Sequence, residues 1–220
     1  MEPDTDPVWY VAYGSNLGTA RFRCYLAGGR PEGGSRTYDG CRDPSEPADA
    51  FSLELPGTLV FAGESGVWGG GMAFFDPDHV GSVAGRARLL TAEQFADVTA
   101  QEMRQAPGGE FARSIVAVLP DVGELHSLGS GRYETLLRVG ARAGVPLLTI
   151  TNGDLGDLTP AAPSAAYLRS IATGLRESHG WDDARIASYL AAAPGAREAW
   201  TPTSVLDALR DGRGPAPSDR

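Results

Sequence analysis

Short apolar runs dominate the first part of the chain, and apolar residues at helical spacing dominate the last part. Runs rich in Val, Ile, Tyr, Phe and Trp that end at Gly, Pro or Asp predict β-strands. We expect strands at 8–13, 59–62, 70–75, 82–90, 114–119, 133–139 and 146–151. The helical spacing predicts helices at 19–27, from 92 onward, at 165–177, at 183–192 and near 205–209.

The order of these elements indicates the fold class. Most predicted strands precede most predicted helices, which favours an α+β fold with a curved or barrel-like sheet over a series of βαβ units. The sequence GARAG at 140–144 separates two predicted strands and is typical of a hairpin turn.

The domain organisation follows from where the pattern is regular. We expect one domain over residues 8–193, a disordered N-terminus over 1–7, and a C-terminal tail over 194–220 with one short helix and a disordered end from Gly212. Residues 28–56 are crowded with Gly, Pro, Arg and Asp and show no period. Such a long irregular stretch inside a compact domain is uncommon, so it predicts a flexible insert or a lid.

Composition narrows the classes of partner. The formal net charge of −9 gives no electrostatic footprint for nucleic acid or for an anionic membrane. No apolar stretch is long enough to span a bilayer. The two cysteines, Cys24 and Cys41, lack metal-ligand spacing, and free thiols in a reducing cytoplasm are the expectation.

The first apolar strand breaks abruptly into a Gly-Ser-Asn sequence. Val8 to Tyr13 favour a half-buried strand. Gly14 permits backbone angles that other residues avoid, and Ser15 and Asn16 suit caps and tight turns. Two interpretations stay open: an ordinary turn, or a loop whose N–H groups face a ligand anion or carbonyl.

The helix that begins after residue 90 contains a carboxylate on its apolar side. Thr91 and Gln94 form a predicted capping box. Glu102 lies four residues after Val98 and seven after Phe95, so it shares their apolar arc. Burial there would raise its pKa towards the range of a general acid–base, unless Glu102 pairs with an arginine or ends the helix in water. The opposite, polar arc holds Glu93, Asp97, Gln101 and Arg104.

These features together resemble the γ-glutamylcyclotransferase-like proteins, which include glutathione-degrading, γ-glutamylamine-cleaving and aminoglycoside-deprotecting members. The family opens with a strand that runs into Tyr-Gly-Ser-Asn-Leu, and it has a Glu at the end of a short helix. Glu102 matches that Glu, although the neighbouring Asp and Gly of the family pattern are absent here. A Pro-Ser-x-x-Tyr sequence ends at Tyr167, with Tyr133 as a second candidate for the aromatic role. The residues that match the opening are Tyr13, Gly14, Ser15, Asn16 and Leu17.

The resemblance implies a distorted small β-barrel flanked by helices. It also implies a pocket formed by residues 13–17 with Glu102 opposite them. The implied reaction cleaves a γ-glutamyl amide or peptide by intramolecular attack, which gives 5-oxoproline and a free amine. Glu102 would be the general acid–base, and neither a metal nor an organic cofactor would be needed. The implied partner is this small molecule, with no role for nucleic acid or membrane.

Several alternatives stay open beside this hypothesis. One is an amide hydrolase or deacylase on the same fold, and another is a non-catalytic binding module. A zinc deacylase would need ligands such as His79, His126 and His179, which lack metal-ligand spacing. A cysteine hydrolase would need one of the two cysteines, neither of which has a histidine close in sequence.

Overall fold

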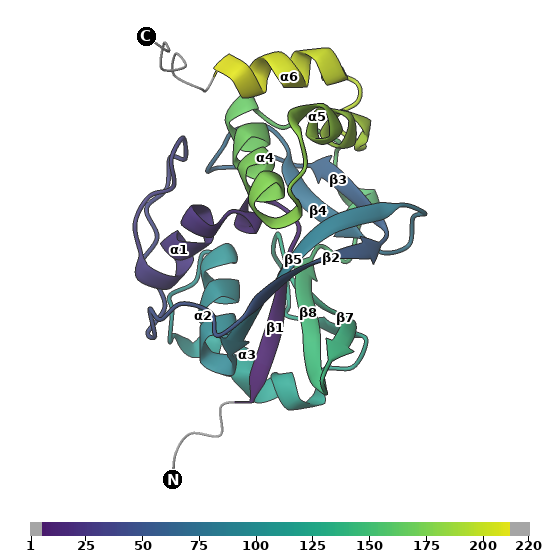
Figure 1. Cartoon of the computed structure of the whole chain (residues 1–220). Helices are drawn as coiled ribbons and strands as arrows, with labels where there is room; N and C mark the ends of the chain where they lie inside the picture. The colour runs from purple at the N-terminus through teal and green to yellow at the C-terminus, as the bar shows by residue number, and fades with distance from the viewer. Residues whose placement is uncertain (1–5, 212–220) are drawn as a thin grey trace.

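The computed structural model describes residues 6–211 (Figure 1). The strands are β1 (Pro7–Ala12), β2 (Ala50–Pro56), β3 (Thr58–Ala62), β4 (Met72–Asp76), β5 (Ser82–Thr91), β6 (Leu125–Ser127), β7 (Thr135–Arg142) and β8 (Val145–Thr151). The α-helices are α1 (Thr19–Ala27), α2 (Ala92–Glu102), α3 (Glu110–Val118), α4 (Ala165–His179), α5 (Asp183–Ala192) and α6 (Pro202–Asp211). Short 3-10 helices form at Ser15–Leu17, Leu119–Asp121 and Leu155–Asp157. Of the segments predicted to be disordered, 1–5 and 212–220 lie outside the described residues, whereas Pro7 already belongs to β1.

The strands form one mixed sheet and one hairpin. The 6-stranded sheet has the order β2-β5-β1-β8-β7-β6, and β3 pairs with β4 in a 2-stranded sheet. The α+β class is therefore confirmed. The predicted barrel is not, because within residues 6–211 the larger sheet ends at β2 and β6 and does not close. The side chain of Thr151 links the two sheets instead, since its Oγ1 donates to Phe75 O at 2.7 Å and accepts from Phe75 N–H at 3.1 Å.

Strand β1 lies in the middle of the sheet and is buried on both faces. It pairs antiparallel with β5 and parallel with β8. Its side chains alternate: Trp9 and Val11 enter one apolar cluster, and Val8 and Tyr10 enter a second cluster on the other face. This double burial explains the uninterrupted apolar run in the sequence.

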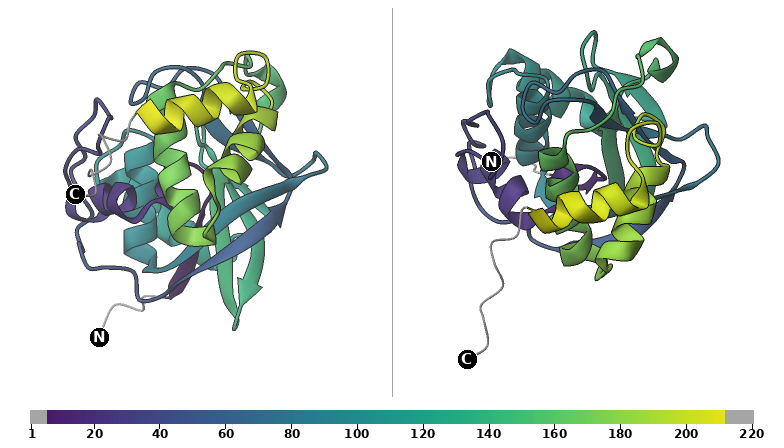
Figure 2. Two further views of the ribbon diagram at one scale, coloured as in Figure 1. Left: turned by 45° about the horizontal axis from the view of Figure 1, so that its top comes forward. Right: turned by 90° about the horizontal axis from the view of Figure 1, so that it is seen from above.

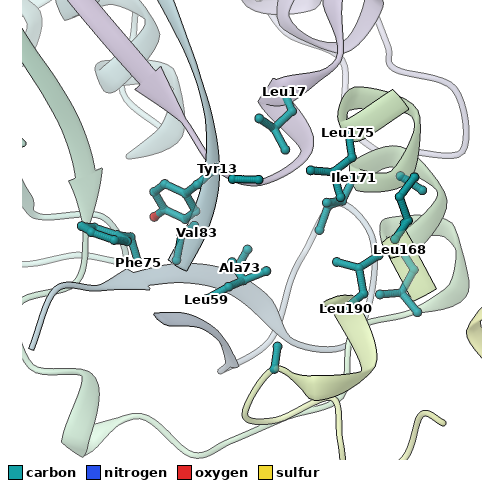
Figure 3. Close-up of a cluster of buried hydrophobic side chains, with 14 of the residues drawn as sticks. Tyr13, Leu17, Leu59, Ala73, Phe75, Val83, Leu168, Ile171, Leu175 and Leu190 are labelled. Atoms are coloured by element: carbon teal, nitrogen blue, oxygen red, sulfur yellow. The ribbon is translucent and has the colours of Figure 1, made fainter. Parts of the chain in front are cut away.

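Two groups of helices cover the two faces of the sheet. Helices α4, α5 and α6 contribute to the first cluster, and they stay together in every view (Figure 1; Figure 2). Figure 3 shows part of this cluster, in which Leu168, Ile171 and Leu175 of α4 point towards Leu17 and Tyr13. Helices α1, α2 and α3 contribute to the second cluster. None of the helices between residues 6 and 211 is both long enough and apolar enough to cross a membrane.

Local chemistry explains most of the element boundaries. The predicted capping box is present, with Gln94 N–H donating to Thr91 Oγ1 at 3.1 Å and Thr91 N–H donating to Gln94 Oε1 at 3.2 Å. The predicted hairpin is also confirmed. Arg142 pairs with Val145, and the two turn residues, Ala143 and Gly144, both have positive φ.

The strand predicted at 114–119 is wrong. These residues form the end of α3 and a 3-10 turn. Their β-branched side chains favour a strand by propensity. Helical spacing, however, lets Ala112 and Ile115 both become fully buried in the second cluster. Packing on α2 and the sheet therefore overrides the local preference.

The 28–56 segment is more regular than predicted, because β2 occupies its last seven residues and pairs with β5. The earlier part is fastened to α2. Gly40 N–H donates to Gln101 Oε1 at 3.2 Å, and Arg42 Nε lies 3.0 Å from Asp97 Oδ2. Asp97 and Gln101 are therefore buried, although the helical pattern placed them on the exposed arc. The role of the segment as a lid stays a prediction.

We expect Asp97→Ala to destabilise the fold. The carboxylate is 1% exposed and accepts from the N–H groups of Arg42 at 3.0 Å and Gly108 at 2.7 Å. Removing it leaves these donors without a partner, which should cost about 2–4 kcal/mol in the free energy of unfolding. Urea unfolding measures this value. Glu46→Ala, which breaks the exposed pair with Arg23, is the control and should cost less than about 1 kcal/mol. Equal effects would contradict the structural role of Asp97.

Candidate active site

One cavity collects nearly all residues that the sequence proposed for the site. It lies where the end of β1, the end of α2, strand β4 and the start of α4 meet. Trp68 and Met72 form part of its wall, and Tyr10 of β1 joins it although the sequence gave no sign of this. The proposed residues that line it are Tyr13, Gly14, Ser15, Asn16, Glu102, Tyr133 and Tyr167.

Leu17 is the exception and does not line the cavity. Its side chain is fully buried in the first apolar cluster. Its N–H donates to Gly14 O at 3.0 Å, which closes the 3-10 turn. The expectation that Leu17 helps to form the pocket is therefore wrong, because its side chain is in the core and the turn itself uses its N–H.

The carboxylate of Glu102 is held at the cavity by an amide from the loop. Asn16 Nδ2 donates to Glu102 Oε1 at 2.8 Å and to Tyr10 Oη at 3.0 Å. Glu102 is the last residue of α2 and is partly exposed. No arginine within residues 6–211 forms an ion pair with it. The carboxylate is thus oriented by a neutral partner and keeps an oxygen for a ligand.

The loop offers a row of backbone donors to the cavity. Within the described part of the chain, the N–H groups of Gly14, Ser15 and Asn16 have no hydrogen-bond partner. Consecutive unpaired N–H groups in a turn form a concave site for anions or carbonyl oxygens. Of the two interpretations of the loop, this geometry favours the one with donors facing a ligand.

Gly14 is needed for space and not for an unusual φ. Its φ is −110°, so a left-handed backbone is not what requires glycine at this position. A Cβ at this position would lie 3.2 Å from Tyr167 Oη and 3.4 Å from the Cβ of Ala73. Even a Cβ here therefore requires Tyr167 or the loop to shift by a few tenths of an ångström.

A buried arginine holds the opposite side of the loop. Arg88 of β5 is 2% exposed, and its Nη1 and Nη2 donate to Asn16 O at 2.6 Å and Leu17 O at 2.8 Å. Burial lowers the pKa of Arg88 to about 9, so the guanidinium stays charged at neutral pH. These bonds fix the loop carbonyls on the sheet. The only sequence signal was that Arg88, like Arg86, lies within a mostly apolar strand.

The phenol groups of three cavity tyrosines stay neutral and form hydrogen bonds with the backbone. Tyr133 Oη donates to Ala73 O at 3.0 Å, and Tyr167 Oη accepts from Ala73 N–H at 3.3 Å. Tyr13 Oη donates to Ile150 O at 2.7 Å. Burial raises the pKa of all three phenols. Tyr133 and Tyr167 thus both line the cavity, and both are hydrogen-bonded to the backbone of the same β4 residue.

The cysteines and histidines lie away from this cavity. Burial raises the pKa of Cys41 to about 12, so its sulfur remains a thiol at neutral pH. His79, His126 and His179 lie in the β4–β5 turn, on β6 and at the end of α4. Within residues 6–211, no group of three His, Cys, Asp or Glu side chains is arranged to hold a metal ion.

Comparisons by sequence give one partial relative. No family model matches the chain. The chain is 29% identical over 187 residues to histone deacetylase 5 of Arabidopsis thaliana. The matched region covers 77% of this chain and 28% of that protein, so the chain spans less than a third of the length of this relative. The name of the relative therefore assigns no activity to this chain.

Comparisons by structure are more extensive. A crystal structure of an uncharacterized human protein aligns with a TM-score of 0.45 and 18% identity, over 79% of this chain and 81% of the other. A structure of gamma-glutamyl cyclotransferase aligns with a TM-score of 0.51 and 17% identity. That alignment covers 94% of this chain and 99% of the other. Because the second likeness extends over nearly the whole of both chains, this protein has the γ-glutamylcyclotransferase-like fold.

Proposed function

We propose that this protein cleaves a γ-glutamyl amide by cyclisation. The substrate carries its own nucleophile, because its α-amine can attack its γ-carbonyl carbon. A C–N bond forms within the glutamyl half, and the C–N bond to the amine half breaks. The products are 5-oxoproline and a free amine. No water is consumed, and the reaction needs no metal or organic cofactor.

The observation that carries this proposal is that Glu102 and the Gly14–Asn16 loop line the same cavity. A carboxylate there can take a proton from the substrate ammonium and return it to the leaving amine. The 2.8 Å bond from Asn16 fixes the orientation of the carboxylate. A single group can therefore perform both proton transfers.

The loop supports the second part of the mechanism. Attack on the γ-carbonyl places negative charge on its oxygen, and preorganised backbone N–H groups stabilise such an oxyanion. The unpaired N–H groups of Gly14, Ser15 and Asn16 are the candidates for this role. The cavity also has to fold the substrate so that its amine and carbonyl meet, which removes much of the entropic barrier.

The decisive test separates cyclisation from hydrolysis. Chelator-treated protein is incubated with γ-glutamyl dipeptides, γ-glutamyl polyamines and glutathione in water enriched with heavy oxygen. We expect equal amounts of 5-oxoproline and released amine by mass spectrometry, with no label incorporated. The chelator should leave the rate unchanged, because the proposed chemistry involves no metal.

Two other outcomes would contradict the proposal. Glutamate that carries the label would identify a hydrolase on the same fold. Binding of a γ-glutamyl compound without any turnover would identify a binding module. Glutamate formed only by later hydrolysis of 5-oxoproline is controlled for by incubating 5-oxoproline alone under the same conditions.

A further inference from the structure

Arg21 is a buried cation at the edge of the cavity with part of its hydrogen-bonding capacity unused. Its side chain comes from α1 and is 7% exposed. Its Nη2 donates to Tyr25 Oη at 3.0 Å and to Tyr38 Oη at 2.8 Å. Within residues 6–211, its Nε and Nη1 atoms are buried and have no partner.

The surroundings of Arg21 supply aromatic rings in place of a carboxylate. The guanidinium carbon lies 4.4 Å from the ring centre of Tyr25 and 4.5 Å from that of Tyr38. Arg21 forms no ion pair with a carboxylate in the described part of the chain. Although burial opposes it, the phenols of Tyr25 and Tyr38 and the carboxylate of Glu102 raise the pKa of Arg21, so the guanidinium stays charged. Its Nε and Nη1 donors remain unsatisfied, which is costly. A bound anion would remove that penalty.

The rest of the cavity has the same charge bias. Arg36, Arg104 and Arg132 also line it, and Glu102 is the sole carboxylate among the lining residues. None of these arginines is paired with a carboxylate within residues 6–211. The whole chain, by contrast, carries a formal net charge of −9. The cavity is therefore a positive region in an acidic protein and favours an anionic ligand.

The glutamyl half of the substrate does not satisfy this excess of positive charge. It carries one ammonium group and one carboxylate. In the proposed site Glu102 faces the ammonium, and the loop N–H groups together with the outer arginines suffice for its carboxylate and carbonyl. Arg21 is left over. Arg21 also lines, with Trp68, a second cavity of about 560 Å³.

We infer that Arg21 binds an anionic group, a carboxylate, on the amine half of the substrate and thereby determines specificity. The inference rests on the proposed function, since it concerns the other half of the same substrate. A guanidinium donates charge-assisted hydrogen bonds to a carboxylate, and Arg21 has the N–H groups of Nε and Nη1 unused.

The test compares two substrates that differ only in this group, γ-glutamyl-alanine and γ-glutamyl-alaninamide. The wild-type protein should prefer the acid by about 10- to 100-fold in kcat/KM, as expected for hydrogen bonds to a charged group. Arg21→Met should reduce this preference to less than about 3-fold, and Arg21→Lys, which keeps the charge, should retain part of it. The readout is the ratio between substrates, so a general loss of rate does not imitate the effect.

Arg23→Met is the matched control. Arg23 lies on the same helix, is largely exposed, pairs with Glu46 and lines neither cavity. It should leave the preference unchanged. A wild-type protein without preference, or an Arg21→Met protein that loses both substrates equally, would overturn the inference.

Binding separates failure of this inference from failure of the proposed reaction. Calorimetry with the Glu102→Gln variant measures the affinity for both compounds without turnover. Tighter binding of the acid, lost on adding Arg21→Met, supports the role of Arg21 even if no cyclisation is found. Equal affinities for the two compounds would contradict it, whatever the reaction. Circular dichroism of each variant checks that the protein is folded.

Discussion

Glu102→Gln is expected to lower turnover of γ-glutamyl amides by at least about 10²–10⁴-fold, the usual contribution of a general acid–base. Glutamine keeps the shape of the side chain and can still accept the hydrogen bond from Asn16 Nδ2. It cannot take a proton from the substrate ammonium. We therefore expect the variant to fold, to bind substrate and to accumulate almost no 5-oxoproline.

The measurement is the single-turnover rate of 5-oxoproline formation with the protein in excess over the substrate. Glu93→Gln is the control, because Glu93 lies in the first turn of the same helix and does not line the cavity. It should keep nearly the full rate. A Glu102→Gln protein that retains most of its activity would show that another group moves the proton. A fall in thermal stability alone, with activity intact below the transition, would place Glu102 among the structural residues.

Gly14→Val is the second change with a large expected effect. A side chain at residue 14 would begin 3.2 Å from Tyr167 Oη and 3.4 Å from the Cβ of Ala73, so the loop would have to move. A displacement of about 1 Å at a reacting centre can cost about 10²-fold in rate. We expect a loss of this size in kcat/KM, with a smaller loss for Gly14→Ala, because alanine adds only the Cβ.

The structural origin of that loss can be tested by relieving the contact. Tyr167→Phe removes the nearest oxygen and should recover part of the activity of Gly14→Ala. Gly123→Val is the control, since a Cβ at that exposed glycine meets nothing within 4 Å. If Gly14→Val turned over substrate as fast as the wild type, the loop donors would not be part of the mechanism. If Gly123→Val were equally harmful, the effect would not be specific to the loop.

The sequence was sufficient for features that depend on neighbouring residues. The unbroken apolar run of β1 indicates that the strand is buried on both faces, and the Thr91–Gln94 capping box predicts the start of α2. The turn at Ala143 and Gly144 follows from local backbone preference. Glu102 stood out because a carboxylate interrupted an apolar helical arc. In each case the deciding interactions lie within about one or two turns of chain, so pattern and propensity describe them.

Only the tertiary structure decided features that join distant segments. The strand propensity of residues 114–119 gave way to a helix because Ile115 is buried against α2 and the sheet. Asp97 became buried because residues 38–42 cover its side of α2. The bond between Asn16 and Glu102 joins residues 86 positions apart, and the unused donors of Arg21 are defined by what surrounds them. A residue's type sets which bonds it can form, but burial and the choice of partner are properties of the packed chain, and these are what turn an acidic sequence into a cationic cavity with one carboxylate.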